Sequence, residues 1–527
     1  MSGKLLFISD IEGCVKMSME TPPRPQSRVL CEAAFYDALR AFLVKDANNK
    51  VAFLGDYFDQ GDGVVESINQ IMRLYNDYKS RVHIILGNRD LNKYRFLYEM
   101  DAEKRTSSGA PETQWSTWKG FYESLPTVST LKKRMAEILG KSMGAGVSKA
   151  DDVVPRLHPT LTENQSCYLM LRMMSAPAAD AFAAETKEDY SAIGIAHEEF
   201  IRNARELFAV GKVVHYDSDF KTLLSHAGGV SPSFFHKESY YTEKLAGLTG
   251  VYYDDMERVR RALMGPPTDF FEAFDPDQLE IYNRPAKVCA TLFDAPLGST
   301  PPPEYFLIQA AALKGEAGQP FASFVNSCDV AGCSGPLPYG AGKASMDAFF
   351  GRIKDQVRVI SHGHVPHCAP VPLVYRREGV NLVFVDNDTS NGYRPAAGIK
   401  GVSDLPLAYV TKGGAQVGVG GLIDGDIKGP PSAAGFESMV GEWDAEAAPL
   451  VALPPEGKTL LVNDRGVEKQ EPIKSVIKYA NNTSLAFLGG FYPAQLIAAS
   501  AGGRRKKQRK TQRKRSTRRR RASRRRA

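Results

Sequence analysis

The sequence predicts an α/β fold built on a mostly parallel sheet, with large, mainly helical insertions and a disordered basic C-terminal tail. Two observations favour this class. Apolar, strand-like runs alternate with helical stretches over the first hundred residues, as they do in parallel sheets. Several such runs end in turns with carboxylate, amide or imidazole side chains, and ligands bind these sheets at the carboxyl ends of strands.

The alternation can be followed along the chain. Residues 5–9 and 51–54 are apolar runs typical of strands, and residues 31–44 between them space their apolar side chains as a helix does. A further helix is expected over 64–78 and a further strand over 82–86. Parallel strands joined by helices bring their carboxyl ends to one edge, so the turns after these strands are expected to lie together.

The alternation then breaks. Asn88 and His226 are 138 positions apart, and so are His226 and His364, which is too far for simple loops. Strand-like runs resume before both histidines, so we interpret the two gaps as insertions forming a cap beside the core. The expected boundaries are a core at 1–100, 216–232 and 355–425, a helical cap at 101–215, a second insertion at 233–354, a linker at 426–457, a small C-terminal segment at 458–502 and the tail at 503–527.

The positive charge is concentrated in one segment. The chain has a net charge of +7, but residues 504–527 contain 16 Lys and Arg and no acid, and the remainder has 51 basic against 60 acidic side chains. The tail lacks large apolar residues, so it is expected to be disordered. Such dense charge binds nucleic acid or another polyanion by counterion release, without reading sequence. A solubilising tail without a dedicated partner is the alternative.

The cysteines and the apolar segments suggest a location. Seven cysteines without a CxxC pair favour a reducing compartment and argue against a disulfide framework. No secretory signal is apparent, and the uncharged stretch 485–503 contains a proline and several glycines, which disfavours a spanning helix. We expect an intracellular, non-secreted protein, with nuclear or virion association suggested by the tail.

Five turns together indicate a metal site. They cover residues 9–13, 55–61, 87–90, 225–229 and 363–366. Their oxygen and imidazole side chains are ligands that hard divalent ions accept. Two such ions about 3.5–4 Å apart lower the pKa of a bridging water and hold phosphoryl oxygens. The pattern therefore predicts metal-assisted phosphoester hydrolysis, on a phosphoprotein, a nucleotide or another phosphorylated substrate.

The same motifs resemble the calcineurin-like metallophosphoesterase superfamily, on the branch near the phosphoprotein phosphatases. That family has D-x-H, GDxxD(R)G, GNH(D/E), an HGG-like turn and GH-x-H or GH-x-P. The resemblance covers residues 4–100, 218–232 and 355–424. It implies a β-sandwich flanked by helices and two divalent ions, which could be Mn, Fe, Mg or Zn.

The resemblance also implies a role for each matching position. Asp10 and Glu12 would bind the first ion, and the Asp56 carboxylate would bridge both ions. Asn88, His226 and His364 would bind the second ion. Three residues remain for the catalytic set: Asp59 would support the site from behind, Asp90 would orient its neighbour, and Arg89 would act on the phosphoryl group.

Three positions depart from the family pattern. Glu12 and Arg89 each stand where the family has a histidine, and Gln60 replaces a phosphate-clamping arginine. Arginine cannot release a proton near neutral pH, but it binds phosphoryl oxygens strongly. The alternatives are that Glu12 is a simple turn acid and that Arg89 pairs with Asp90 or another acid and holds the loop. Lys93 is expected to be a solvated charge. These departures favour a second hypothesis, a pseudo-phosphoesterase that acts as a binding or structural protein tethered to nucleic acid by its tail.

Overall fold

The computed structural model describes three long stretches of the chain and several shorter ones. They are residues 3–11, 29–58, 61–99, 130–142, 154–227, 283–299, 305, 353, 356–364, 372–377, 383–387, 401–405, 407–428, 442–444, 459–464, 467–472 and 485–488. Glu12, Asp59, Gln60 and the tail lie outside these residues, as does most of the second insertion.

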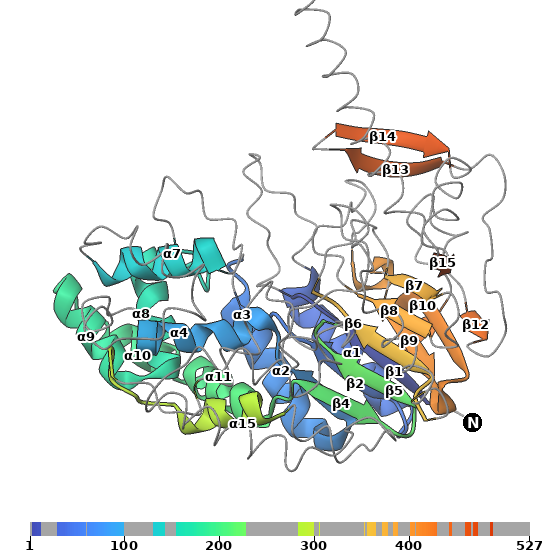
Figure 1. Cartoon of the computed structure of the whole chain (residues 1–527), viewed down its shortest axis with the longest axis horizontal. Coiled ribbons are helices and arrows are strands. Elements are labelled where there is room, and N and C mark those ends of the chain that lie inside the picture. The colour runs from blue at the N-terminus through green and yellow to red at the C-terminus, as the bar shows by residue number, and fades with distance from the viewer. Residues whose placement is uncertain are drawn as a thin grey trace, which may run out of the picture.

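Two β-sheets form the core (Figure 1). The first has the order β11-β10-β9-β1-β2-β3, with β12 also paired to β10. Its strands are β1 (Lys4–Ile8), β2 (Lys50–Leu54), β3 (Val82–Ile85), β9 (Leu407–Thr411), β10 (Gln416–Ile423), β11 (Asp426–Lys428) and β12 (Glu442–Asp444). The second has the order β15-β7-β8-β6-β5-β4. Its strands are β4 (Val214–Asp217), β5 (Thr222–Ser225), β6 (Val359–His362), β7 (Leu373–Arg377), β8 (Val383–Asp386) and β15 (Leu485–Leu488).

Each sheet has a parallel centre. Strands β1, β2 and β3 run parallel, with Leu6 opposite Val51 and Phe53 opposite Ile84. Strands β5, β6 and β8 are also parallel. The side chains of β1 and β2 are almost entirely buried because the sheet is covered on both faces, which explains their continuous apolar runs. The carboxyl ends of these six parallel strands therefore converge between the two sheets.

Helices cover the first sheet and extend into a separate helical region (Figure 1). Helices α1 (Ala33–Lys45) and α2 (Val64–Tyr78) follow β1 and β2 and pack on each other. The short α3 (Asn88–Leu91) and α4 (Arg95–Glu99) follow β3. The helical region contains α7 (Leu131–Ser142), α8 (Glu163–Met174), α9 (Ala176–Thr186), α10 (Ser191–Ala196), α11 (Glu198–Val210) and α15 (Arg284–Thr291). Helix α11 packs against α2, which attaches this region to the core.

The predicted fold class is confirmed, and two details differ. Strands β11 and β12 lie within residues 426–457, where a linker was expected, because an Asp424-Gly425 turn reverses the chain and extends the sheet edge. Cys31 is disulfide-bonded, whereas wholly reduced thiols were expected; Cys167 and Cys289 are free and buried. A separate hairpin joins β13 (Thr459–Asp464) and β14 (Val467–Pro472). No helix among the described residues is long and apolar enough to cross a membrane.

A polar cluster ties the edges of the two sheets together, away from the strand ends that bear the ligand turns. The Asp217 carboxylate on β4 accepts hydrogen bonds from Lys50 Nζ on β2 and from His83 Nε2 on β3, each at 2.8 Å. The His83 and His215 rings lie 4.4 Å apart, and Lys212 Nζ is 3.3 Å from His215 Nδ1. Burial, His83 and Lys212 lower the pKa of His215 to about 3, so this imidazole is neutral in the folded protein.

The neutral His215 makes the fold acid-sensitive. The unfolded chain protonates this histidine near pH 6.5, while the folded protein does so only near pH 3, so stability is present above pH 6.5 and is lost as the pH falls. Between pH 7 and 4.5 we expect a loss of about 2–3 kcal/mol from this group. The unfolding midpoint of His215→Gln in denaturant should therefore depend less on pH than that of the wild type. The partly exposed His158→Gln is the control, and an unchanged pH dependence in His215→Gln would contradict the account.

Candidate metal centre

The predicted ligand turns come together between the two sheets. Asp10, Asp56 and Asn88 follow the carboxyl ends of β1, β2 and β3, and His226 and His364 follow those of β5 and β6. Residues up to 354 positions apart in the sequence are thus in contact, as in the hydrogen bond from the backbone N–H of His364 to Asp10 Oδ2 at 3.1 Å. The structure brings these five predicted ligands together. The sixth predicted ligand, Glu12, and the predicted supporting residue Asp59 lie outside the described residues.

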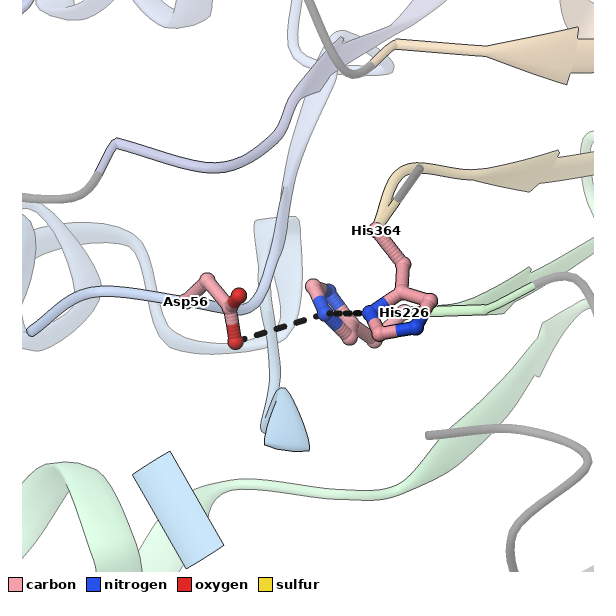
Figure 2. A group of neighbouring side chains, drawn as sticks. All are labelled: Asp56, His226 and His364. Atoms are coloured by element: carbon pink, nitrogen blue, oxygen red, sulfur yellow. Dashed lines mark hydrogen bonds and ion pairs between the residues drawn. The ribbon is translucent and has the colours of Figure 1, made fainter. Parts of the chain in front are cut away.

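Potential ligand atoms of Asp56, His226 and His364 lie close together (Figure 2), and Asn88 adds a fourth. Asn88 Oδ1 lies 3.1 Å from both His226 Nε2 and His364 Nδ1, and these two nitrogens are 3.1 Å apart. Asp56 Oδ1 lies 3.3 Å from His226 Nε2. Ligand atoms held at 2.0–2.2 Å from one ion stand about 2.9–3.5 Å from each other in octahedral or tetrahedral geometry. The spacing fits a single divalent ion bound by these four residues.

The hydrogen bond at the far side of His226 prepares its ring for a metal. Its Nδ1 lies 2.7 Å from the Leu54 carbonyl oxygen, which can only accept, so Nδ1 is the protonated nitrogen. In the neutral ring Nε2 therefore presents a lone pair, and it faces the oxygens of Asn88 and Asp56, which are also electron-pair donors. Only a cation or a proton can satisfy such a group. Metal-binding histidines commonly donate their second ring N–H to a backbone carbonyl in this way.

The pKa shifts of His226 and Asp56 agree with a site for a cation. Burial lowers the pKa of His226, but the Asp56 carboxylate overrides it and raises that pKa to about 10. Burial opposes ionisation of Asp56 in turn, but His226, Arg89 and His364 hold its pKa well below the usual range. A proton thus occupies the position between these groups when no metal is bound, and a divalent ion would replace it.

Backbone strain is concentrated at the ligands. Asp10, Asp56 and His364 have φ angles of 50°, 55° and 78°, in the left-handed region that few non-glycine residues adopt. Strain of this kind persists only when the surroundings determine the conformation. At Asp10 the surroundings are the Ser9 hydroxyl, which donates to Asp10 Oδ2, and Gly363, where a Cβ would overlap both Ser9 and Asp10. The turn sequences therefore fix the directions of the ligand side chains.

Asp90 joins two of the ligand loops from behind. Its side chain is fully buried, and its two oxygens accept the backbone N–H groups of Asp56 (3.0 Å), Tyr57 (2.9 Å) and Gly87 (2.7 Å). Asp56 and Gly87 belong to the loops after β2 and β3. Asp90 was predicted to orient its neighbour Arg89; the described contacts instead place its carboxylate against the backbone of the loop that holds Asp56 and of the residue before Asn88.

Arg89 lies on α3 with Asn88, and Lys93 lies in the 3-10 turn that follows α3. Arg89 Nε is 3.1 Å from Asp56 Oδ2, and the Arg89 backbone N–H donates to Asp56 Oδ1 at 3.1 Å. Lys93 was expected to be a solvated surface charge, which is wrong: it is fully buried, and its Nζ donates to the Arg89 carbonyl at 3.0 Å. Burial and the nearby Asp56 charge raise the pKa of Asp90 to about 7, and the Lys93 charge partly opposes this rise.

Sequence reasoning missed some supporting residues. Asn387, after β8, donates from Nδ2 to the His362 carbonyl at 2.8 Å and to Ser361 Oγ at 2.9 Å, and so supports the end of the strand that leads to His364. The sequence assigned no role to the turn after β8. The Leu54 carbonyl could have been anticipated, because a histidine that follows a neighbouring strand end needs a nearby acceptor.

A second group of metal-type side chains is better explained as an ion-pair cluster. His83, His215 and Asp217 also place ligand atoms within 4.8 Å of one another. Here, however, the lysine ammonium groups of Lys50 and Lys212 already lie against the carboxylate and the imidazole. Positive charge is therefore supplied to both the carboxylate and the imidazole without an ion.

This arrangement defines a class of protein: an α/β core of two sheets with a metal-ligand set at the ends of its parallel strands. Residues 3–245 match the sequence model of the family described as calcineurin-like phosphoesterase. The match spans a little under half of the chain, and it agrees with the resemblance that the motifs predicted. His364 lies outside the matched residues and joins the site through β6.

Two kinds of relative were found. The Arabidopsis thaliana serine/threonine-protein phosphatase BSL2 is 26% identical over 128 residues, which span 24% of this chain and only 12% of the plant protein. Among solved structures, a cold-active protein-tyrosine phosphatase of a psychrophilic Shewanella species is 13% identical, with 81% of this chain and 79% of that chain covered. A second structure of a cold-active protein tyrosine phosphatase is also 13% identical, with 82% of this chain and 80% of that chain covered. The TM-scores are 0.29 and 0.28, which are too low to support an argument about fold.

Proposed function

We propose that this chain hydrolyses phosphoesters with a metal-activated water. The observation that supports it is the convergence of Asn88 Oδ1, His226 Nε2, His364 Nδ1 and Asp56 Oδ1, in a core whose first part matches a phosphoesterase family. Phosphoester hydrolysis needs a nucleophile at neutral pH and positive charge near phosphorus, and such a ligand set provides for both once it is loaded.

Each residue of the site would have a distinct role in hydrolysis. Asp56, Asn88, His226 and His364 would hold a divalent ion, such as Mn, Fe, Mg or Zn, which lowers the pKa of bound water and polarises the phosphoryl group. In the two-ion arrangement that the resemblance implies, these four residues hold the second ion, and Asp10 and Glu12 would serve the first. The Leu54 carbonyl keeps His226 in the tautomer that binds a cation, and Asp90 keeps the Asp56 loop in place. The Arg89 guanidinium would stabilise charge on the phosphoryl oxygens.

The direct test is hydrolysis of aryl phosphate mono- and diesters by the full chain, stripped with a chelator and then supplied with Mn²⁺, Mg²⁺, Fe²⁺ or Zn²⁺. Metal-dependent turnover that disappears in Asp56→Asn and persists in the exposed Asp37→Asn would support the proposal. If the folded protein shows no turnover above the Asp56→Asn background with any of these metals, the proposed hydrolysis is wrong.

Arg89 also predicts which esters are cleaved. Because arginine does not donate a proton near neutral pH, leaving groups that require protonation should react slowly. A general acid contributes about 10²–10⁴-fold, so we expect alkyl phosphates to be at least about 10²-fold slower than aryl phosphates of low leaving-group pKa. Rates over a series of aryl and alkyl esters measure this dependence. Equal rates across the series would mean that another residue protonates the leaving group.

A pseudo-phosphoesterase is the second candidate, and the contact between Arg89 and Asp56 favours it. The guanidinium is held against a predicted metal ligand, so the loaded site could bind a phosphorylated ligand without cleaving it. Tight, metal-dependent binding of a phosphorylated ligand without product formation would distinguish this function from hydrolysis.

The tail is proposed to hold nucleic acid or another polyanion. Residues 504–527 contain 16 Lys and Arg without aromatic residues, which fits phosphate contacts rather than base stacking. Binding of duplex DNA by the full chain should fall by about 10³-fold or more between 50 and 200 mM salt. A chain truncated after Gly503 should lose this binding, and retained affinity in that variant would assign it to the body instead.

A further inference from the structure

The Arg89 guanidinium occupies one side of the carboxylate that is expected to join two ions. Arg89 Nε lies 3.1 Å from Asp56 Oδ2, and the Arg89 backbone N–H lies 3.1 Å from Asp56 Oδ1. Both side chains are withdrawn from solvent, with 14% of Arg89 and 3% of Asp56 exposed. The guanidinium is therefore a fixed cation in a place of low solvent screening, and it cannot lose its charge.

The opposite side of Asp56 is the one that faces the ligand group. Asp56 Oδ1 points to His226 Nε2, which shares its neighbours Asn88 Oδ1 and His364 Nδ1. An ion held there would thus use Oδ1, while Arg89 Nε uses Oδ2. The two oxygens of one carboxylate would be neutralised by two different cations, one divalent ion and one guanidinium.

Asp10 also makes hydrogen bonds. It is the other predicted ligand of the first ion that the structure describes. Its Oδ2 accepts hydrogen bonds from the Ser9 hydroxyl and from the His364 backbone N–H. In the described part of the chain, the groups of three or more metal-type ligand atoms are Asp56–His226–His364 and His83–His215–Asp217, and neither includes Asp10. The hydrogen bond from the His364 backbone to Asp10 holds the His364 loop close to the end of β1.

We propose that Arg89 takes the place of one of the two metal ions, so that this centre holds a single divalent ion on Asp56, Asn88, His226 and His364. The guanidinium supplies the second positive charge next to the reacting phosphoryl group. The chemistry rests on the proposed function, but the number of bound ions does not depend on turnover. Position 89 is a histidine in the family pattern and an arginine here. The permanent charge of Arg89 would therefore replace the charge of one ion.

The test measures how many Mn²⁺ ions bind per chain and whether their electron spins are coupled. The full chain is stripped with a chelator, titrated with Mn²⁺, and examined by elemental analysis and by electron paramagnetic resonance. We expect one Mn²⁺ per wild-type chain with an uncoupled signal, because two ions about 3.5–4 Å apart would be spin-coupled. His226→Ala should lose that ion.

Variants at position 89 separate charge from shape. Arg89→Lys keeps the charge and should still bind one ion, whereas Arg89→His and Arg89→Ala should bind two, with a coupled signal. Arg73→His, at an exposed arginine paired with Glu199, is the matched control and should bind one. Two spin-coupled ions in the wild type would overturn the proposal, even if the variants fail to fold. A single bound ion in both Arg89→His and Arg89→Ala would also overturn it. One bound ion without turnover would instead sink the proposed function alone.

Discussion

Replacement of His226 by alanine is expected to reduce metal-dependent hydrolysis by about 10³-fold or more and to abolish tight metal binding. His226 is fully buried, and its Nε2 is within 3.3 Å of ligand atoms from Asn88, His364 and Asp56. Its removal leaves the Asp56 carboxylate without the main charge that holds its pKa low. The ion would lose one ligand, and the partner that keeps another ligand ionised would be lost at the same time.

The same substitution also has a structural cost, which must be separated from the chemical one. Loss of the buried ring and of its hydrogen bond to the Leu54 carbonyl should cost about 2–4 kcal/mol. Circular dichroism and an unfolding curve therefore accompany the rate and metal-binding measurements. His197→Ala, at a partly exposed histidine at the start of α11, is the control and should retain full activity. A folded His226→Ala protein that keeps its metal dependence would show that the ion is held elsewhere.

The sequence was sufficient to predict which turns meet, because the positions of these turns depend on local rules. Apolar runs predict strands, alternation with helices predicts that the strands are parallel, and parallel strands bring turns such as those of Asp56 and Asn88 to one edge. Residues 407–423 likewise have a hairpin pattern, two apolar runs flanking a Lys-Gly-Gly turn, and the structure pairs β9 with β10 antiparallel.

The parts that the sequence did not predict depend on contacts between distant segments. The burial of Lys93 follows from the packing of the region after β3, where its ammonium reaches the Arg89 carbonyl and lies over the Phe58 ring, 5.6 Å from its centroid. A charged side chain offers no sequence signal for such a position, since most lysines are solvated. The support that Asn387 gives to β6 likewise depends on which strands become neighbours, and no local pattern specifies that order.

Asp90→Ala is expected to destabilise the fold by about 3–5 kcal/mol and to lower metal affinity at least tenfold. The carboxylate accepts three buried N–H groups, from Asp56, Tyr57 and Gly87, and each loses its partner in the variant. An unsatisfied buried donor costs about 1–3 kcal/mol, so even partial relaxation leaves a large effect. The loss should extend to metal binding because two of these groups set the directions of the Asp56 and Asn88 loops.

Asp90→Asn distinguishes the positioning role from a general loss of packing. Asparagine has nearly the same shape, and its single carbonyl oxygen can take over the Asp56 and Gly87 N–H groups that now share Oδ2. Its amide group would then face the Tyr57 N–H, donor against donor, so we expect an intermediate loss of about 1–3 kcal/mol. Metal affinity, measured by titration calorimetry, should follow the same order, with wild type above Asp90→Asn and Asp90→Ala weakest. If Asp90→Ala instead bound the ion as tightly as the wild type, the ligand loops would be held by other contacts, because a carboxylate that aligns Asp56 through its backbone cannot be removed without displacing that ligand.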